Sequence, residues 1–177
     1  MKNNVVLIGM PGAGKSTVGV VLAKLLGFRF LDSDLLIQEA EKRLLSEIIA
    51  QDGLERFMQI EDEINAGIRA ENTVIATGGS AVYGRRAMEQ LRAHGSVVYL
   101  RLSFEEICAR VGDIKQRGIV LREDQTFRAL YDERCPLYER FAELTVDAEG
   151  RSVEELALRI LSLLRQENET GVRIPFR

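Results

Sequence analysis

A glycine-rich segment near the start of the chain constrains the fold more than any other feature. Residues 9–17 read GMPGAGKST and match the pattern GxxxxGK[ST]. They follow an apolar run at residues 5–8 and precede apolar residues at helical spacing, which is the strand–loop–helix context in which this pattern binds phosphate. Glycines let the backbone wrap closely around a phosphate, and the start of the helix adds its positive dipole end. We expect Lys15 to contact the β- and γ-phosphates of ATP and the Ser16 hydroxyl to coordinate Mg²⁺.

Short apolar runs alternate with helical patterns along the chain, which predicts an α/β fold. We expect strands at residues 5–8, 28–31, 73–76, 97–102 and 144–146. Helical patterns occupy residues 14–26, 35–51, 53–69, 84–93, 104–111, 125–141 and 153–164. This alternation implies a parallel sheet with helices on both faces. We expect one kinase domain over residues 1–165 and a polar C-terminal tail over residues 166–177.

Composition and charge argue against several classes of function. The 177 residues carry 24 Lys and Arg against 27 Asp and Glu, a formal net charge of -3, whereas nucleic-acid-binding proteins usually show a basic face. No apolar run approaches the roughly 20 residues that span a bilayer. The first residues lead directly into a strand, without room for a signal peptide, and the two cysteines fit free thiols in a reducing compartment. We therefore expect a cytoplasmic enzyme that binds neither nucleic acid nor membrane.

Polar and glycine residues follow the second and third predicted strands, at the carboxyl edge where α/β sheets bind ligands. Asp32 can orient Mg²⁺ through water, and Asp34 can accept a hydrogen bond from the hydroxyl that attacks the phosphate. The alternative is that this segment only caps a helix, but beside a phosphate loop the first interpretation is favoured. Gly78 and Gly79 either allow close backbone approach to a small ligand or form a tight turn that needs positive φ, and the residues alone leave both open.

In this order and spacing, the segments GMPGAGKST, LDSD, DGLERF, ATGGSAV, Arg117 and ERCPLY resemble the shikimate kinase family over roughly residues 4–165. The resemblance implies a three-layer P-loop fold with a five-stranded parallel sheet of order 2-3-1-4-5 and a mobile lid at about residues 112–124. It also implies an enzyme of aromatic amino acid biosynthesis that uses MgATP to phosphorylate the 3-hydroxyl of shikimate. Since a small kinase with a lid can act alone, we expect a monomer.

The resemblance also implies roles for individual residues. The ATP-binding set would be Gly12, Ala13, Gly14, Lys15, Ser16, Thr17, Arg117 and Arg110, the last lying against the adenine. Shikimate would be held by Asp34, Gly78, Gly79 and Arg134, the last of which would bind the substrate carboxylate. Arg117 would be a lid arginine that stabilises the transferring phosphate, in a catalytic set with Lys15 and Asp34. The Mg²⁺ ligands would be Ser16 and, through water, Asp32.

The acceptor pocket departs from the family pattern at Met58, Ser80 and Gly118. Met58 stands where the family has a second arginine for the carboxylate, and Arg56 lies about 200° away around the same predicted helix. Loss of that guanidinium would weaken binding of an anionic acceptor about 10- to 150-fold. The alternative function is therefore a kinase of the same fold that acts on a polyol, a sugar acid or a hydroxy amino acid. A regulatory module that binds ATP without phosphorylating a metabolite is a further alternative.

Overall fold

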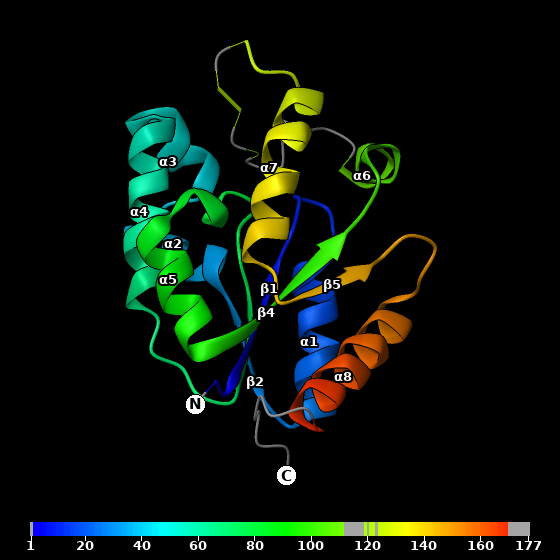
Figure 1. The fold of residues 1–177 in the computed structure, drawn as a ribbon. Coiled ribbons are helices and arrows are strands. Elements are labelled where there is room, and N and C mark those ends of the chain that lie inside the picture. Colours follow the sequence, from blue (N-terminus) through cyan, green and yellow to red (C-terminus); the bar gives the residue numbers. More distant parts are fainter. Residues whose placement is uncertain (1, 112–118, 120, 123, 170–177) are drawn as a thin grey trace.

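The structure, a computed structural model, describes residues 2–111, 119, 121, 122 and 124–169. A five-stranded sheet of order β2-β3-β1-β4-β5 forms its centre (Figure 1). The strands are β1 (Asn4–Ile8), β2 (Arg29–Asp32), β3 (Thr73–Ala76), β4 (Gly95–Arg101) and β5 (Leu144–Asp147). Every neighbouring pair of these strands is parallel. The order and the parallel pairing confirm the sheet that the resemblance implies.

The central strand β1 is buried along its whole length. It pairs with β3 on one side and with β4 on the other, and its apolar residues face helices on both sides of the sheet. Asn4 is its polar exception, and the side chain is fully used. The Asn4 Nδ2 donates to the carbonyl oxygens of Ala70 (2.7 Å) and His94 (3.2 Å), and Oδ1 accepts from the Thr73 N–H (3.1 Å). The loop that follows β1 therefore leaves from a strand that is fixed on both edges.

Helices cover both faces of the sheet. On one side α1 (Lys15–Leu26) packs against α8 (Val153–Glu169), and on the other α4 (Leu54–Gly67) packs against α5 (Arg85–His94) (Figure 1). The remaining described helices are α2 (Ser33–Glu41), α3 (Leu45–Asp52), the 3₁₀ helix η1 (Ala81–Tyr83), α6 (Phe104–Val111) and α7 (Phe127–Phe141). A separate apolar cluster joins α2, α3 and α4 through Ile37, Ile48, Phe57 and Ile60. This cluster forms one wall of the region above the sheet's carboxyl edge.

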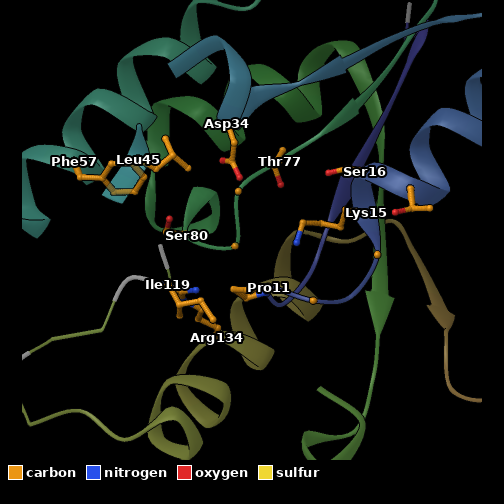
Figure 2. Close-up of a pocket in the computed structure, with 15 residues that line it drawn as sticks. Pro11, Lys15, Ser16, Asp34, Leu45, Phe57, Thr77, Ser80, Ile119 and Arg134 are labelled. Carbon is orange, nitrogen blue, oxygen red and sulfur yellow. The ribbon is translucent and has the colours of Figure 1, made fainter. Parts of the chain in front are cut away.

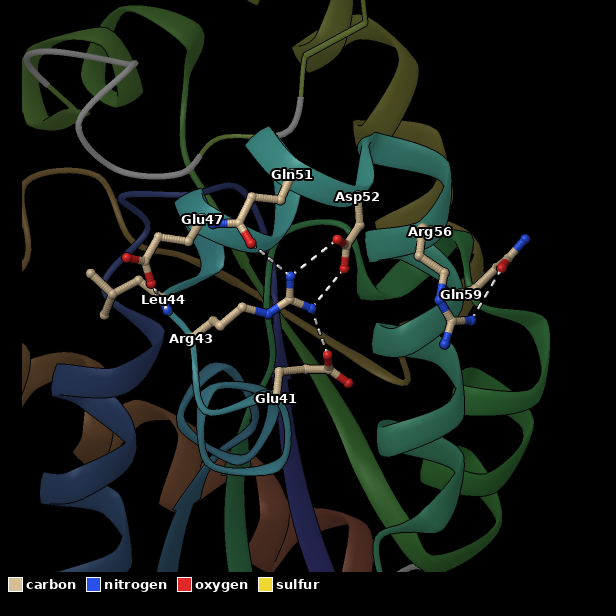
Figure 3. A network of polar contacts seen from close by, with 8 residues as sticks. All are labelled: Glu41, Arg43, Leu44, Glu47, Gln51, Asp52, Arg56 and Gln59. Carbon is tan, nitrogen blue, oxygen red and sulfur yellow. Dashed lines mark hydrogen bonds and ion pairs between the residues drawn. The ribbon is translucent and has the colours of Figure 1, made fainter.

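The long helix expected after the second strand is divided into α2 and α3. Lys42 adopts the left-handed conformation with φ of 54°, which ends α2. The Arg43 guanidinium then donates to Glu41, Gln51 and Asp52 across the break, with its shortest bond, 2.6 Å, to Asp52 (Figure 3). These bonds fix the end of α2 against the end of α3. The apolar periodicity continues through the break, which is why the sequence pattern predicts one helix.

Two predicted boundaries fall on parts of the chain that the structure describes incompletely. The helix α8 continues to Glu169, beyond the end expected at residue 164, and residues 170–177 of the predicted tail lie outside the described residues. Residues 112–118 of the predicted lid, including Arg117 and Gly118, also lie outside them. The lid and the domain boundary at residue 165 therefore remain predictions. Among the described residues, no helix combines the length and the apolar character needed to cross a membrane.

Candidate active site

The predicted phosphate loop lies between the end of β1 and the start of α1. Gly12 has a φ of 83°, and a Cβ at this position would lie 2.8 Å from Cγ2 of Val111, so a larger residue would be strained. Lys15 is buried beneath the loop, where its Nζ donates to the carbonyl oxygens of Gly9 (2.8 Å) and Met10 (2.9 Å). Burial lowers the pKa of Lys15 to about 8. A cation that burial has stripped of water is a strong partner for a phosphate oxygen.

Asp32 both caps α2 and contacts the phosphate loop. Its Oδ1 accepts a hydrogen bond from the Asp34 backbone N–H at 3.0 Å, so it is the N-cap of α2. Its Oδ2 accepts a hydrogen bond from the Ser16 Oγ at 2.6 Å, which places a carboxylate against the phosphate loop. The hydroxyl and the carboxylate together present oxygen atoms of the kind that Mg²⁺ prefers. The donor set therefore fits a magnesium ion. Because Asp32 caps the helix, the Asp34 carboxyl is not needed for capping and lines the cavity described next.

Lys15 and Asp34 face one cavity of about 600 Å³ at the carboxyl ends of β1, β2 and β3 (Figure 2). Its walls come from the phosphate loop, three helices, the segment after β3 and α7, and the lining residues are Pro11, Gly12, Gly14, Lys15, Ser16, Thr17, Asp34, Leu45, Phe57, Thr77, Gly78, Gly79, Ser80, Ile119 and Arg134. Burial, followed by the charge of Asp32, raises the pKa of Asp34 to about 6. A carboxyl with this pKa is ionised at neutral pH. Its pKa also lies close to neutral pH, which makes the carboxylate an efficient proton acceptor.

Gly78 and Gly79 are required by close packing at the wall of this cavity. A Cβ at Gly78 would collide with the carboxyl groups of Asp34 and Glu61, and a Cβ at Gly79 would lie 2.7 Å from Cδ of Pro11. Neither of the two is among the described glycines with positive φ. The segment does form a turn, in which the Ala81 N–H donates to the Gly78 carbonyl oxygen at 3.4 Å, but the turn needs no positive φ. The backbone of both glycines also lines the cavity.

Arg134 extends from α7 to the same cavity, with only 1% of the residue exposed. Its Nε donates to the Tyr83 hydroxyl at 3.3 Å, and its guanidinium carbon lies 5.2 Å from the centre of the Tyr83 ring. The Tyr83 hydroxyl donates in turn to Glu133 at 2.7 Å. These contacts fix the direction of the guanidinium, which is planar and can bind a carboxylate through paired hydrogen bonds.

Glu61 is a residue of this region that the sequence interpretation missed. It lies on α4 with 2% of the residue exposed, and its Oε1 has no hydrogen-bond partner among the described residues. Burial raises the pKa of Glu61 to about 7, although a hydrogen bond with the Ser80 side chain opposes the rise. The available signal was its position three residues after Met58, because residues at this spacing share a helix face. Tyr83, which supports Arg134, was also missed, and its sequence context carries no comparable signal.

Some predicted residues do not line the cavity. Of the predicted nucleotide-binding residues that the structure describes, Ala13 and Arg110 are not part of the lining. Arg110 instead forms an ion pair with Glu106 along α6, at 2.8 Å. Arg117 lies outside the described residues. Arg56 is exposed and makes its contacts along its own helix (Figure 3), so it does not take the place of an arginine at position 58.

The strand order, the phosphate loop and the cavity that joins Lys15 to Asp34 define a P-loop kinase, a phosphotransferase that acts on a small hydroxyl compound. The family model "Shikimate kinase" matches residues 11–165, and the chain belongs to this family. It is 40% identical over 167 residues to shikimate kinase of Mycobacterium avium (strain 104), across 93% of this chain and 94% of that protein. It is 38% identical over 167 residues to the Mycobacterium marinum enzyme, across 93% and 90%.

Solved structures give the same result. Shikimate kinase from Acinetobacter baumannii in complex with shikimate is similar with a TM-score of 0.85 and 33% identity, over 94% of this chain and 95% of that one. Shikimate kinase from Aquifex aeolicus is similar with a TM-score of 0.81 and 30% identity, over 95% and 99%. A gluconokinase from Sinorhizobium meliloti shares the fold alone, with a TM-score of 0.51 and 17% identity over 98% and 100%.

Proposed function

We propose that this protein transfers the γ-phosphoryl group of ATP to the 3-hydroxyl of shikimate. The observation that carries the proposal is that Lys15, Asp34 and Arg134 face one cavity of about 600 Å³. Membership of the shikimate kinase family and similarity to an enzyme solved in complex with shikimate support this choice of acceptor. In the reaction, the bond from the γ-phosphorus to the ADP oxygen breaks while a bond to the shikimate oxygen forms. The proton of the hydroxyl passes to the Asp34 carboxylate.

The phosphate loop provides the nucleotide side of the reaction. The loop leads into the N-terminus of α1, whose first backbone N–H groups and positive dipole end attract phosphate, and Lys15 supplies a buried positive charge beside them. Ser16 and, through water, Asp32 would hold Mg²⁺, which would neutralise charge on the phosphates. Lys15 currently donates to two loop carbonyl oxygens, and it exchanges these bonds for phosphate oxygens when ATP binds.

The opposite wall provides the acceptor side. Arg134 binds the shikimate carboxylate, and Asp34 holds the hydroxyl that receives the phosphate. Gly78 and Gly79 line the cavity with backbone, which can approach the substrate closely. A side chain at either position would collide with neighbouring residues of the wall. The acceptor is therefore held at its anionic end and at its reactive hydroxyl, which orients it toward the γ-phosphate.

Release of ADP by the purified protein tests the proposal directly. We expect MgATP alone to give slow release, and millimolar shikimate to increase the rate strongly, with 3-phosphorylated product detectable by phosphorus NMR. Asp34→Asn is expected to bind ATP and shikimate without turnover. Parallel assays with polyols, sugar acids and hydroxy amino acids test the alternative acceptors. Stimulation by one of these compounds and not by shikimate, with ATP binding intact, would reject shikimate as the substrate.

A further inference from the structure

Met58 lies beside a small second cavity, and Arg134 lines both this cavity and the large one. The second cavity has a volume of about 10 Å³, about the space of one water molecule. Met58 contributes to its wall from α4, and Arg122 contributes from the segment that precedes α7. A second guanidinium thus reaches the neighbourhood of Met58 and Arg134 from a different part of the chain.

Both guanidinium groups are placed by the same tyrosine. The guanidinium carbon of Arg122 lies 5.9 Å from the centre of the Tyr83 ring, and that of Arg134 lies 5.2 Å from it. Glu133 completes the arrangement, because it accepts hydrogen bonds from the Tyr83 hydroxyl (2.7 Å), from Arg122 Nη1 (3.1 Å) and from Gln125 Nε2 (2.8 Å). Arg122 is therefore held at this position by two contacts of different kinds.

Arg122 keeps donors for a further partner. The Arg122 Nη1 donates to Glu133, whereas the Arg122 Nε and Nη2 have no protein partner among the described residues. Two guanidinium groups that share one ring repel each other, and an anion bound between or beside them reverses that repulsion. A carboxylate is planar and accepts paired hydrogen bonds, so one bound to Arg134 in the large cavity can also accept from Arg122, which shares with Arg134 the lining of the small cavity alone.

We propose that Arg122 supplies a second guanidinium for the carboxylate of the acceptor, where Met58 leaves the α4 wall apolar. The inference rests on the proposed function and deepens it, because it explains how this chain retains an anionic acceptor. Arg134 binds the carboxylate from the buried side, and Arg122 binds it from the solvent side. Arg122 is then a specificity-determining residue that favours acids over neutral hydroxyl compounds.

The test compares Arg122→Ala, Arg122→Lys and the wild type in steady-state assays with shikimate and with its methyl ester. Arg122→Ala is expected to raise the KM for shikimate about 10-fold or more, with little change in kcat or in the KM for ATP. The KM of Arg122→Lys for shikimate should lie between those of the wild type and Arg122→Ala, because lysine keeps the charge and loses the paired geometry. The methyl ester lacks the anionic charge, so its KM should hardly change between wild type and Arg122→Ala.

Arg128→Ala is the matched control. Arg128 is an exposed arginine on α7 that lies over the Phe104 ring and pairs with Asp132, and it lines neither cavity. Its KM for shikimate should equal that of the wild type. In the double variant Met58→Arg with Arg122→Ala, a guanidinium from α4 should restore the low KM. Because the restoring group comes from α4 and not from the segment around residue 122, rescue distinguishes loss of a carboxylate contact from damage to the fold near residue 122.

The outcomes separate this inference from the function on which it rests. If the wild type phosphorylates shikimate and Arg122→Ala leaves the KM unchanged, Arg122 is only an exposed partner of Glu133 and the inference is wrong. An equal rise in KM for shikimate and for its methyl ester would also overturn it. If the wild type does not turn over shikimate, the proposed function fails, and the inference fails with it.

Discussion

Replacing Glu61 by glutamine is expected to stabilise the ligand-free protein at neutral and alkaline pH. Glu61 is 2% exposed and its Oε1 has no hydrogen-bond partner among the described residues. Burial raises its pKa from 4.5 to about 7, the charge of Asp34 adds to the rise, and the Ser80 hydrogen bond and the charges of Arg134 and Lys15 oppose it. The folded protein therefore holds an ionised carboxyl above pH 7 in surroundings that disfavour the charge.

The sign and the size of the effect follow from the two pKa values. Between pH 4.5 and about 7 the folded carboxyl is protonated while the unfolded one is ionised, so the folded state binds more protons and the free energy of unfolding falls as pH rises. Each pH unit corresponds to about 1.4 kcal/mol, which gives a penalty of about 3 kcal/mol that is absent below pH 4.5 and complete above pH 7. Glutamine cannot ionise and removes this penalty. The buried amide hydrogens of glutamine need hydrogen-bond partners, and lack of them costs about 1–2 kcal/mol of stability at every pH. This cost reduces the gain in stability by the same amount throughout the pH range.

The observable is therefore the pH dependence of the difference between variant and wild type. Urea unfolding without ligand at several pH values from 4.5 to 8 gives the free energy of unfolding of each protein. The value for Glu61→Gln minus the value for the wild type should increase by about 3 kcal/mol across this range. Glu63→Gln changes an exposed glutamate of the same helix and should show no such trend. A difference that stays constant with pH, or that shrinks as pH rises, would refute the reasoning.

Three further predictions concern catalysis and ligand binding. The kcat/KM for shikimate should rise with pH through about 6, because proton transfer needs the ionised form of Asp34, whose pKa is raised to about 6; a profile that is flat from pH 5 to 8 would contradict this. Gly79→Ala should weaken acceptor binding at least about 10-fold, because its Cβ would lie 3.1 Å from Nη1 of Arg134, and should also weaken ATP binding, because it would lie 2.7 Å from Cδ of Pro11 in the phosphate loop; unchanged shikimate affinity by calorimetry would show that the wall yields. Ser16→Ala should raise the Mg²⁺ concentration needed for half-maximal activity about 10-fold, because the hydroxyl beside Asp32 is lost; an unchanged Mg²⁺ requirement would exclude Ser16 as a ligand.

The sequence predicts the parts of the site that depend on local pattern and strand order. The loop motif places Lys15 and Ser16 at the start of α1, and the polar segment after β2 places Asp32 and Asp34 at the same edge. These residues meet because β1, β2 and β3 are neighbours in a parallel sheet, whose carboxyl ends all lie on one side. The identity and direction of the three strands are therefore enough to predict that these residues lie close together.

Features that depend on tertiary contact could not be predicted in this way. The break between α2 and α3 is fixed by Arg43, whose partners Gln51 and Asp52 follow eight and nine residues later, beyond the reach of helix periodicity. The association of Arg122 with Arg134 depends on one ring, Tyr83, at which residues from two parts of the chain meet. Substitution of the family arginine by Met58 is visible in the sequence, but the guanidinium near it is visible only in the fold.

The site combines charges that the ligand-free fold disfavours with chemistry that requires them. Burial lowers the pKa of Lys15 to about 8 and raises that of Asp34 to about 6, so burial pushes each group toward its neutral form. Phosphoryl transfer needs the opposite, a charged lysine and an ionised carboxylate. Phosphate oxygens favour the charged form of Lys15, and a shikimate hydroxyl that donates to Asp34 favours the ionised carboxylate. Each substrate therefore relieves the penalty on the group that it contacts, so the two groups should keep their active charges over a wider pH range when both substrates are bound.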